Sequence, residues 1–201
     1  MPNAFAKLLA GIEAGASWEL MGQAESVRAL LEEVFDERIH RNDWATYQLR
    51  VNLQKKPDVA SYAGYIVAEG NPTSGPYQGT SFVWFPGDGG SVVALVIGTD
   101  GFGADTAILG RPGHIRRLRA LSRLHSGRLW VKPDLLELNT EVPDAIAGGW
   151  PAIDAAMKSY SRVIYAAAPV RPGEPGSAQV VADLLDLFFY EHRSRHKGTA
   201  Q

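Results

Sequence analysis

Residues 80–97 read TSFVWFPGDGGSVVALVI, and this stretch decides the fold. Its two apolar runs, 80–85 and 91–97, are rich in the β-branched and aromatic residues that favour strands. The proline, glycine and aspartate residues between the runs are typical of a turn. Because the connection is short, the sequence predicts an antiparallel hairpin.

Four more segments around this hairpin are predicted to be extended. In residues 47–54, apolar side chains alternate with polar ones, which indicates a half-buried strand with one polar face. Residues 63–68 (AGYIVA) and 161–168 (SRVIYAAA) are apolar runs of strand length. Residues 128–132 (RLWVK) fit a short strand or an extended link.

Helices are predicted on either side of the strands and between them. Residues 24–40 have apolar side chains at the 3.6-residue spacing of an amphipathic helix. Other helices are expected at about 1–14, 113–125, 150–160 and 178–193. A regular alternation of strands and helices, which would indicate a doubly wound sheet, is missing.

The sequence therefore predicts an α+β fold. We expect a single domain with a mainly antiparallel twisted sheet, a mixed sheet being the alternative, flanked by N- and C-terminal helices. The expected divisions are N-terminal helices packed on the domain at 1–40, an α+β core at 41–170, a linker at 171–177, and a C-terminal helix with a basic tail at 178–201.

Composition excludes several classes of protein. The 201 residues contain no cysteine, so there is no disulfide, thiolate nucleophile or cysteine-based metal site. No apolar run approaches the roughly 20 residues that cross a bilayer. The first residues contain a single lysine and Glu13 and fit a helix better than a signal peptide. We expect a cytoplasmic protein without membrane contact.

Charge is unevenly distributed, although the net charge is only −2. Residues 1–37 carry two basic and seven acidic residues, whereas residues 106–133 carry seven basic residues and no acidic one. A local excess of this size matters more for partners than the net value.

The basic segment contains the most unusual stretch, GRPGHIRRLRAL at 110–121. Arg116 and Arg119 in this stretch, and Arg123 just after it, recur at i, i+3 and i+7 and so share one helical face. The start of the helix offers backbone N–H groups that favour anions. The candidate DNA-backbone contacts are Arg111, His114, Arg116, Arg119 and Arg123. The alternative is that these arginines pair internally with the acidic helix at 25–37.

Aromatic residues are concentrated between positions 44 and 85, which hold eight of the 19. In the strand at 80–85, Phe82 and Trp84 face one side, and Val83 and Phe85 face the other. One side must pack the core. The other either lies under a helix or lines a pocket in which a flat ligand stacks. Core packing is the simpler alternative for all of these rings.

Motifs that mark common enzymes and cofactor sites are absent. The sequence has no P-loop and no G-x-S-x-G. The glycine-rich run at 98–103 lacks the third glycine of a dinucleotide fingerprint and is predicted to be a loop. His192 and His196 lie among basic residues, which would repel a metal cation. We expect no enzyme, no metal and no cofactor. If the chain is an enzyme, His114 with Asp100 or Asp105 is the remaining acid–base pair.

Two stretches carry a resemblance to a known family. They are GTSFVWFPGDGGSVVALVIGTD at 79–100 and KSYSRVIYAAAPV at 158–170, which a closing amphipathic helix follows. The turn Gly98-Thr99-Asp100 and the residues Lys158, Tyr160, Tyr165, Ala166 and Ala167 are similar to the N-terminal specificity domain of McrB-type restriction systems. The similarity covers about residues 40–190, and GRPGHIRRLRAL has no counterpart in the family pattern.

This resemblance implies a domain that binds methylated DNA, flips the modified base and holds it in an aromatic pocket. The candidate pocket residues are Tyr65, Tyr77 and Trp84, chosen by type and position. We therefore expect a non-catalytic DNA-recognition domain or subunit of a bacterial defence or restriction complex, with DNA and a motor or nuclease protein as partners. The alternative is a scaffold subunit that docks a partner through its acidic N-terminal helix and its C-terminal helix, which carries Phe188 and Phe189.

Overall fold

The hairpin predicted at 80–97 forms the centre of the sheet. Strands β3 (Thr80–Gly87) and β4 (Gly90–Ile97) pair antiparallel from Thr80 opposite Ile97 to Gly87 opposite Gly90. In the computed structural model the described residues are 3–13, 24–38, 47–53, 59–68, 70–87, 89–98, 112–135, 137, 139–147, 149–171 and 173–196.

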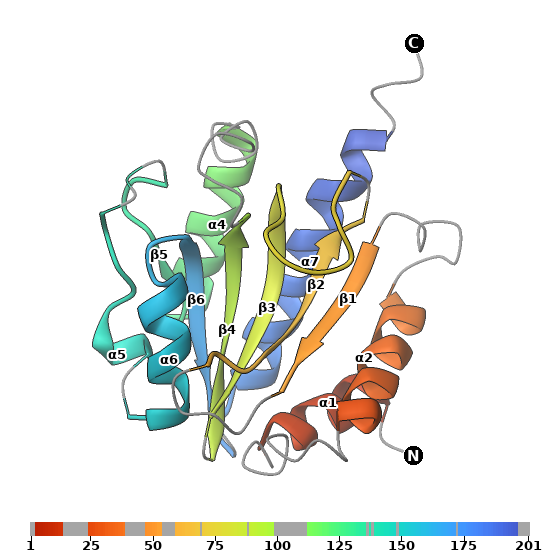
Figure 1. Ribbon diagram of the computed structural model, residues 1–201. Helices are drawn as coiled ribbons and strands as arrows, with labels where there is room; N and C mark the ends of the chain where they lie inside the picture. Colours follow the sequence, from red (N-terminus) through yellow and green to blue (C-terminus); the bar gives the residue numbers. More distant parts are fainter. Residues whose placement is uncertain are drawn as a thin grey trace.

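The sheet has six strands in the order β1-β2-β3-β4-β6-β5, and all pairs are antiparallel. The other strands are β1 (Tyr47–Asn52), β2 (Tyr62–Val67), β5 (Trp130–Val131) and β6 (Ile164–Val170). The α+β single-domain prediction is confirmed, and the mixed-sheet alternative is wrong. β6 enters the sheet between β4 and the two-residue strand β5 (Figure 1).

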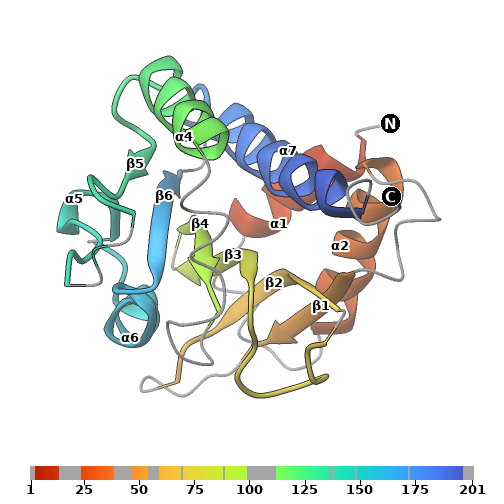
Figure 2. The same ribbon diagram turned by 90° about the horizontal axis from the view of Figure 1, so that it is seen from above.

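Helices cover both faces of the sheet (Figure 2). One face packs against α1 (Ala4–Glu13), α2 (Ala24–Arg38), α4 (Pro112–Leu124) and α7 (Ser177–His196). The other face packs against α5 (Asp144–Ala147) and α6 (Pro151–Tyr160), which cover β3, β4 and β6. Helices therefore stand at both ends of the chain and on both sides of the sheet.

The period-2 pattern of β3 produces these two cores. Phe82 and Trp84 point to the α1–α2–α4–α7 face, and Val83 and Phe85 point to the α5–α6 face. All eight residues of β3 are buried. The α5–α6 pair reaches β2 only at its start, where Tyr62 joins its core among the described residues. Beside this contact the connection from β2 to β3 crosses the face (Figure 1).

The last strand begins later than the sequence predicts. β6 starts at Ile164 rather than at residue 161, because α6 continues into a further turn. The Ser161 amide donates to the Met157 carbonyl at 2.9 Å, and the Val163 amide donates to the Tyr160 carbonyl at 2.9 Å. The short helix α5 was not predicted from the sequence, as its four residues give too little periodicity.

Among the described helices, none is both long and apolar enough to cross a membrane.

Candidate functional site

A glycine in β2 creates a hollow on the α5–α6 face of the sheet. Arg50, Gly64 and Val83 are cross-strand neighbours in β1, β2 and β3, so they share one row on one face. Gly64 puts no side chain between the other two. A Cβ there would approach the Phe82 carbonyl oxygen to 3.1 Å and a Val83 methyl to 3.2 Å.

Aromatic rings stand around this hollow, which has a volume of about 410 Å³. Four rings line it: Tyr62, Tyr77, Phe85 and Tyr160. The Tyr160 ring centre lies 5.6 Å from that of Phe85 and 6.3 Å from that of Tyr62. We call this hollow the aromatic pocket. Its size falls in the range of about 300–1,000 Å³ that is usual for small-ligand sites.

The connection between β2 and β3 forms the outer wall of the aromatic pocket. Asn71 fixes the base of this loop, because its side-chain amide donates to the Val67 and Gln78 carbonyls at 2.7 and 2.9 Å. The Gln78 amide in turn donates to the Asn71 side-chain oxygen at 2.7 Å. Residues 72–76 between these anchors are exposed.

Arg50 ties the exposed part of the loop to the sheet. Its guanidinium donates to the Gly75 carbonyl at 2.6 Å and also to the Pro72 carbonyl. The guanidinium carbon lies 5.4 Å from the centre of the Tyr77 ring, within cation–π distance. Arg50 is only 9% exposed, and its Nε is buried without a hydrogen-bond partner among the described residues.

The electrostatic character of the aromatic pocket follows from its lining. Arg50 is the single charged side chain among the described residues that line it, and no described carboxylate does. Burial raises the pKa of the Tyr77 hydroxyl to about 12, and its hydrogen bond to Ser81 opposes part of that shift. Burial also raises the pKa of Tyr160, with a smaller effect from Tyr62. The raised pKa values keep the Tyr77 and Tyr160 hydroxyls neutral at pH 7, so the aromatic pocket favours neutral or anionic ligands.

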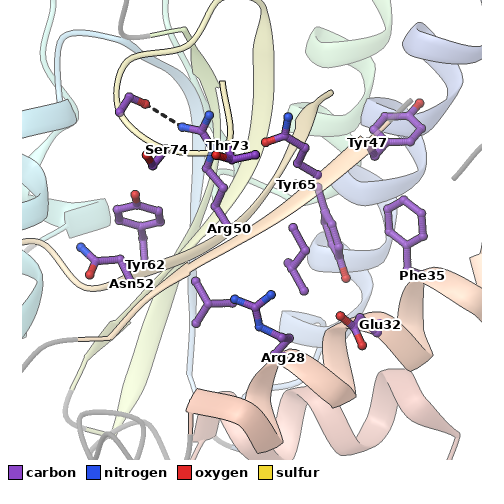
Figure 3. A pocket seen from close by; sticks show the side chains of 14 residues that line it. Arg28, Glu32, Phe35, Tyr47, Arg50, Asn52, Tyr62, Tyr65, Thr73 and Ser74 are labelled. Atoms are coloured by element: carbon purple, nitrogen blue, oxygen red, sulfur yellow. Dashed lines mark hydrogen bonds between the residues drawn. The ribbon is translucent and has the colours of Figure 1, made fainter. Parts of the chain in front are cut away.

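A second, more polar hollow adjoins the aromatic pocket at Arg50, Tyr62 and Gly75. It has a volume of about 630 Å³ and lies between α2 and the edge strand β1. Figure 3 shows Arg28 and Glu32 projecting toward it from α2, while Arg50 and Tyr62 lie on the side of the loop. The two hollows together form a continuous surface around β1 that can take a ring at one end and polar groups at the other.

Of the three predicted base-pocket residues, the structure places one in the aromatic pocket. Tyr77 lines it, and its hydroxyl lies 2.6 Å from the Ser81 hydroxyl. Trp84 and Tyr65 are fully buried on the opposite face, in the core beneath the α1–α2–α4–α7 layer. Tyr65 pairs with Phe82 across β2 and β3, and Trp84 is two residues after Phe82, so all three point to the same face. The Tyr65 hydroxyl donates to the Leu31 carbonyl at 2.7 Å. Trp84 is therefore a core residue, and Tyr65 is buried as well but borders the polar hollow beside α2 rather than the aromatic pocket.

The predicted DNA-backbone residues also separate into groups. Arg116, Arg119 and Arg123 are exposed on α4, as their spacing predicts. His114 is 2% exposed, because it lies on the inner side of α4 with its ring 5.7 Å from that of Tyr165, so it cannot contact a DNA backbone. Arg111 lies outside the described residues, as do Asp100 and Asp105.

α4 lies on the face opposite the aromatic pocket (Figure 2), so the arginines and the pocket do not form one surface. The alternative of internal pairing with α2 also finds no support among the described residues. α4 contacts β5 and α7, and α2 pairs with α1 through Lys7 and Glu33 at 3.4 Å.

The residues proposed for partner docking lie inside the protein. Phe188 and Phe189 are 2% and 4% exposed, and their rings pack against Phe35, Tyr47 and Tyr65. The apolar stripe of α2 is buried in the same core. The apolar stripes of α2 and α7 pack against the sheet, so these stripes offer no docking surface.

Sequence reasoning missed Arg50, Tyr62, Gly64 and Tyr160 as pocket residues. A signal was present for Arg50 and Gly64, because the alternation in strands 47–54 and 63–68 places a polar and a small residue on a shared face. Tyr160 lies at the C-terminal end of α6, and only tertiary packing brings it over β2 and β3.

Two other buried ionisable groups, Lys132 and His125, form internal polar contacts. Lys132 donates to the Arg162 carbonyl at 2.6 Å, and burial lowers its pKa. His125 and Asp183 join α4 to α7 at 2.8 Å. Within the described part of the chain, no group of three or more histidine, aspartate or glutamate side chains could hold a metal ion.

Comparisons with known proteins add no information on this site. A scan against protein-family models found no match, and searches of curated proteins and of solved structures found none with significant similarity.

Proposed function

We propose that this chain is a non-catalytic nucleic-acid recognition domain that stacks an unpaired base in the aromatic pocket. The observation that carries the proposal is the combination of four aromatic rings with the buried cation of Arg50 in one cavity. Each base has a π-face, and stacking on an aromatic side chain contributes about 1–3 kcal/mol. A base that is extruded from a duplex needs such walls to offset the loss of stacking.

The charges of the site support a base better than a cationic ligand. A quaternary ammonium also prefers an aromatic cage, but the guanidinium of Arg50 would repel it. A nucleobase is neutral and carries oxygen and nitrogen acceptors that suit tyrosine hydroxyls. The hydroxyls of Tyr62 and Tyr160 are the nearest candidates, since both rings line the pocket and are partly exposed.

The adjoining polar hollow suits the sugar and phosphate that remain attached to such a base. It offers the Arg28 guanidinium and the hydroxyls of Thr73 and Ser74, with the Glu32 carboxylate beside them. The side-chain amides of Gln48 and Asn52 already donate to the Asn71 and Ala60 carbonyls. On the other side, Ser159 at the end of α6 adds an exposed hydroxyl. These groups contact a backbone without reading sequence, so specificity for a modified base would come from the pocket.

The resemblance to McrB-type specificity domains points in the same direction. It favours a methylated cytosine as the base, and a cytoplasmic restriction or defence complex with a motor or nuclease as the setting. Of the residues that the sequence indicates for the base, Tyr77 keeps that role. The groups beside the pocket, rather than the α4 arginines, contact the nucleic-acid backbone.

The experiment is fluorescence anisotropy of labelled single strands and duplexes, unmodified and cytosine-methylated, over a salt series. Tyr160→Ala removes a pocket wall, and Tyr190→Ala removes an exposed tyrosine on the other face as the matched control. Tyr160→Ala should weaken binding about 5- to 100-fold, the equivalent of one lost stacking contact, and Tyr190→Ala should leave it unchanged. Absence of binding at low salt, or equal effects of both changes, would contradict the proposal.

A further inference from the structure

The outer surface of α4 carries an arginine ridge, which we define as Arg116, Arg119 and Arg123. All three side chains are exposed, and none forms an ion pair with a described carboxylate. The ridge faces away from the aromatic pocket because α4 lies on the opposite side of the sheet (Figure 2). A nucleic acid held in the pocket therefore leaves the ridge unused.

An apolar groove runs beside the ridge, between α4 and α7. Its volume is about 370 Å³, and Ala120, Leu121 and Leu187 supply its apolar surface. At its edge the Arg117 guanidinium carbon lies 4.6 Å from the centre of the Tyr190 ring. Exposed residues of both helices, Arg117 on α4 and Tyr190 on α7, stand at this edge.

The largest exposed apolar side chains of the described residues belong to these same two helices. Leu124 on α4 is 68% exposed, and Tyr190 on α7 is 55% exposed. Arg116, Ala120 and Leu124 follow one another at i, i+4 and i+8, so they form a line along α4. Ala120 thus lies between the arginine ridge and the apolar groove, and its small side chain leaves the surface between them low.

This composition fits a protein partner better than a phosphate backbone. Phosphates require cations but gain nothing from an exposed leucine such as Leu124. Tyrosine and arginine around an apolar centre are typical of protein interfaces. A groove between two helices receives an amphipathic helix through apolar anchors at i, i+3, i+4 and i+7.

We propose that the α4–α7 groove and the arginine ridge bind an acidic amphipathic helix of a partner protein. The apolar side of the helix covers Leu121 and Leu124 of α4, and its acidic side faces the ridge. This inference is independent of the proposed function, since it uses the other face of the sheet. The domain can then hold a base on one face and its partner on the other.

The test uses two synthetic helical peptides with the full chain. One peptide carries leucines at i, i+3, i+4 and i+7 with glutamates on the opposite side, and the other has the same composition in scrambled order. Anisotropy at physiological salt should show the amphipathic peptide binding about tenfold more tightly, since only its apolar anchors are in register. A labelled DNA duplex is titrated in parallel.

Three variants locate the site. Leu124→Ser and Arg119→Glu should each weaken the amphipathic peptide about fivefold or more, while Arg162→Glu, an exposed arginine on another element, should change it less than about twofold. Unfolding midpoints by circular dichroism confirm that all three variants fold. Equal binding of the two peptides, no binding at millimolar protein, or a loss of duplex affinity in Arg119→Glu without a loss of peptide affinity would overturn the inference.

Discussion

Arg50 on the edge strand lies over Tyr77 of the loop, with the guanidinium carbon 5.4 Å from the ring centre. The same guanidinium donates to two loop carbonyls, those of Pro72 and Gly75. One buried side chain therefore holds the outer wall of the aromatic pocket against β1.

Replacing this anchor should loosen the loop. Arg50→Met keeps the length of the stem but leaves two carbonyls without a charged donor, which should lower the free energy of unfolding by roughly 1–3 kcal/mol. Amides of residues 73–79 should exchange faster in hydrogen-exchange mass spectrometry, while those of β4 keep their relative protection. Arg162→Met, at an exposed position, serves as the control. Unchanged exchange in the loop would show that Arg50 does not hold it.

Filling the floor of the pocket should abolish binding. In Gly64→Ala the new methyl group is crowded by the Phe82 carbonyl and by Val83, and this overpacking should cost about 1–3 kcal/mol of stability. The control is Gly113→Ala on α4, where the nearest atom lies 3.5 Å away. That change should leave stability unaltered or raise it by up to about 1 kcal/mol. Urea denaturation and oligonucleotide anisotropy measure both effects, and full binding by Gly64→Ala would exclude the pocket floor as a contact.

Folding and binding should respond to different aromatic residues. Trp84 is fully buried against Tyr65 and Phe82, so Trp84→Ala should lower the free energy of unfolding by about 3–5 kcal/mol. Tyr160→Ala, at a partly exposed wall, should cost less stability and more affinity. The comparison is made by denaturation and anisotropy on the same preparations. If a folded Trp84→Phe variant lost affinity while Tyr160→Ala kept it, the assignment of these rings to core and pocket would be reversed.

Alkaline pH should weaken the fold through Tyr77. Its pKa is about 12 in the folded protein and near 10 when the residue is unfolded, so the folded state holds the proton more tightly. Stability should therefore fall as pH rises above 10 and continue to fall up to about 12, by roughly 3 kcal/mol from this residue.

The variant Tyr77→Phe isolates this contribution. It loses the hydrogen bond to Ser81, which should cost about 1 kcal/mol at neutral pH. Between pH 10 and 12, however, its stability should decline less than that of the parent. Denaturation at several pH values gives both slopes, and parallel curves would show that Tyr77 does not titrate in this range.

Local patterns in the sequence predicted much of the fold. The hairpin at 80–97, the helix at 24–38 and the alternation in β1 all follow from periodicity and turn residues within one segment. The boundary of β6 was wrong because hydrogen bonds at Ser161 and Val163 extend α6, and such capping bonds are not visible in an apolar run.

The site was harder to predict because it depends on which face a residue occupies and on what covers that face. Period 2 correctly separated Phe82 and Trp84 from Val83 and Phe85, but it did not say which pair faces a hollow. That depends on the end of α6, where Tyr160 lies beside Tyr62 of β2, and on the loop anchored by Asn71, both of which are tertiary features. The sequence therefore pointed to Tyr77 of the aromatic pocket but named Tyr65 and Trp84 rather than Tyr62 and Tyr160.

The most direct measurement is photocrosslinking of an oligonucleotide in which iodouracil replaces the unpaired base, with the crosslinked residue identified by mass spectrometry. A base in the aromatic pocket should crosslink to Tyr62, Tyr77 or Tyr160, and Gly64→Ala should suppress the product. Crosslinks confined to α4 or α7, or a yield unaffected by Gly64→Ala, would contradict the proposal that this pocket receives a base.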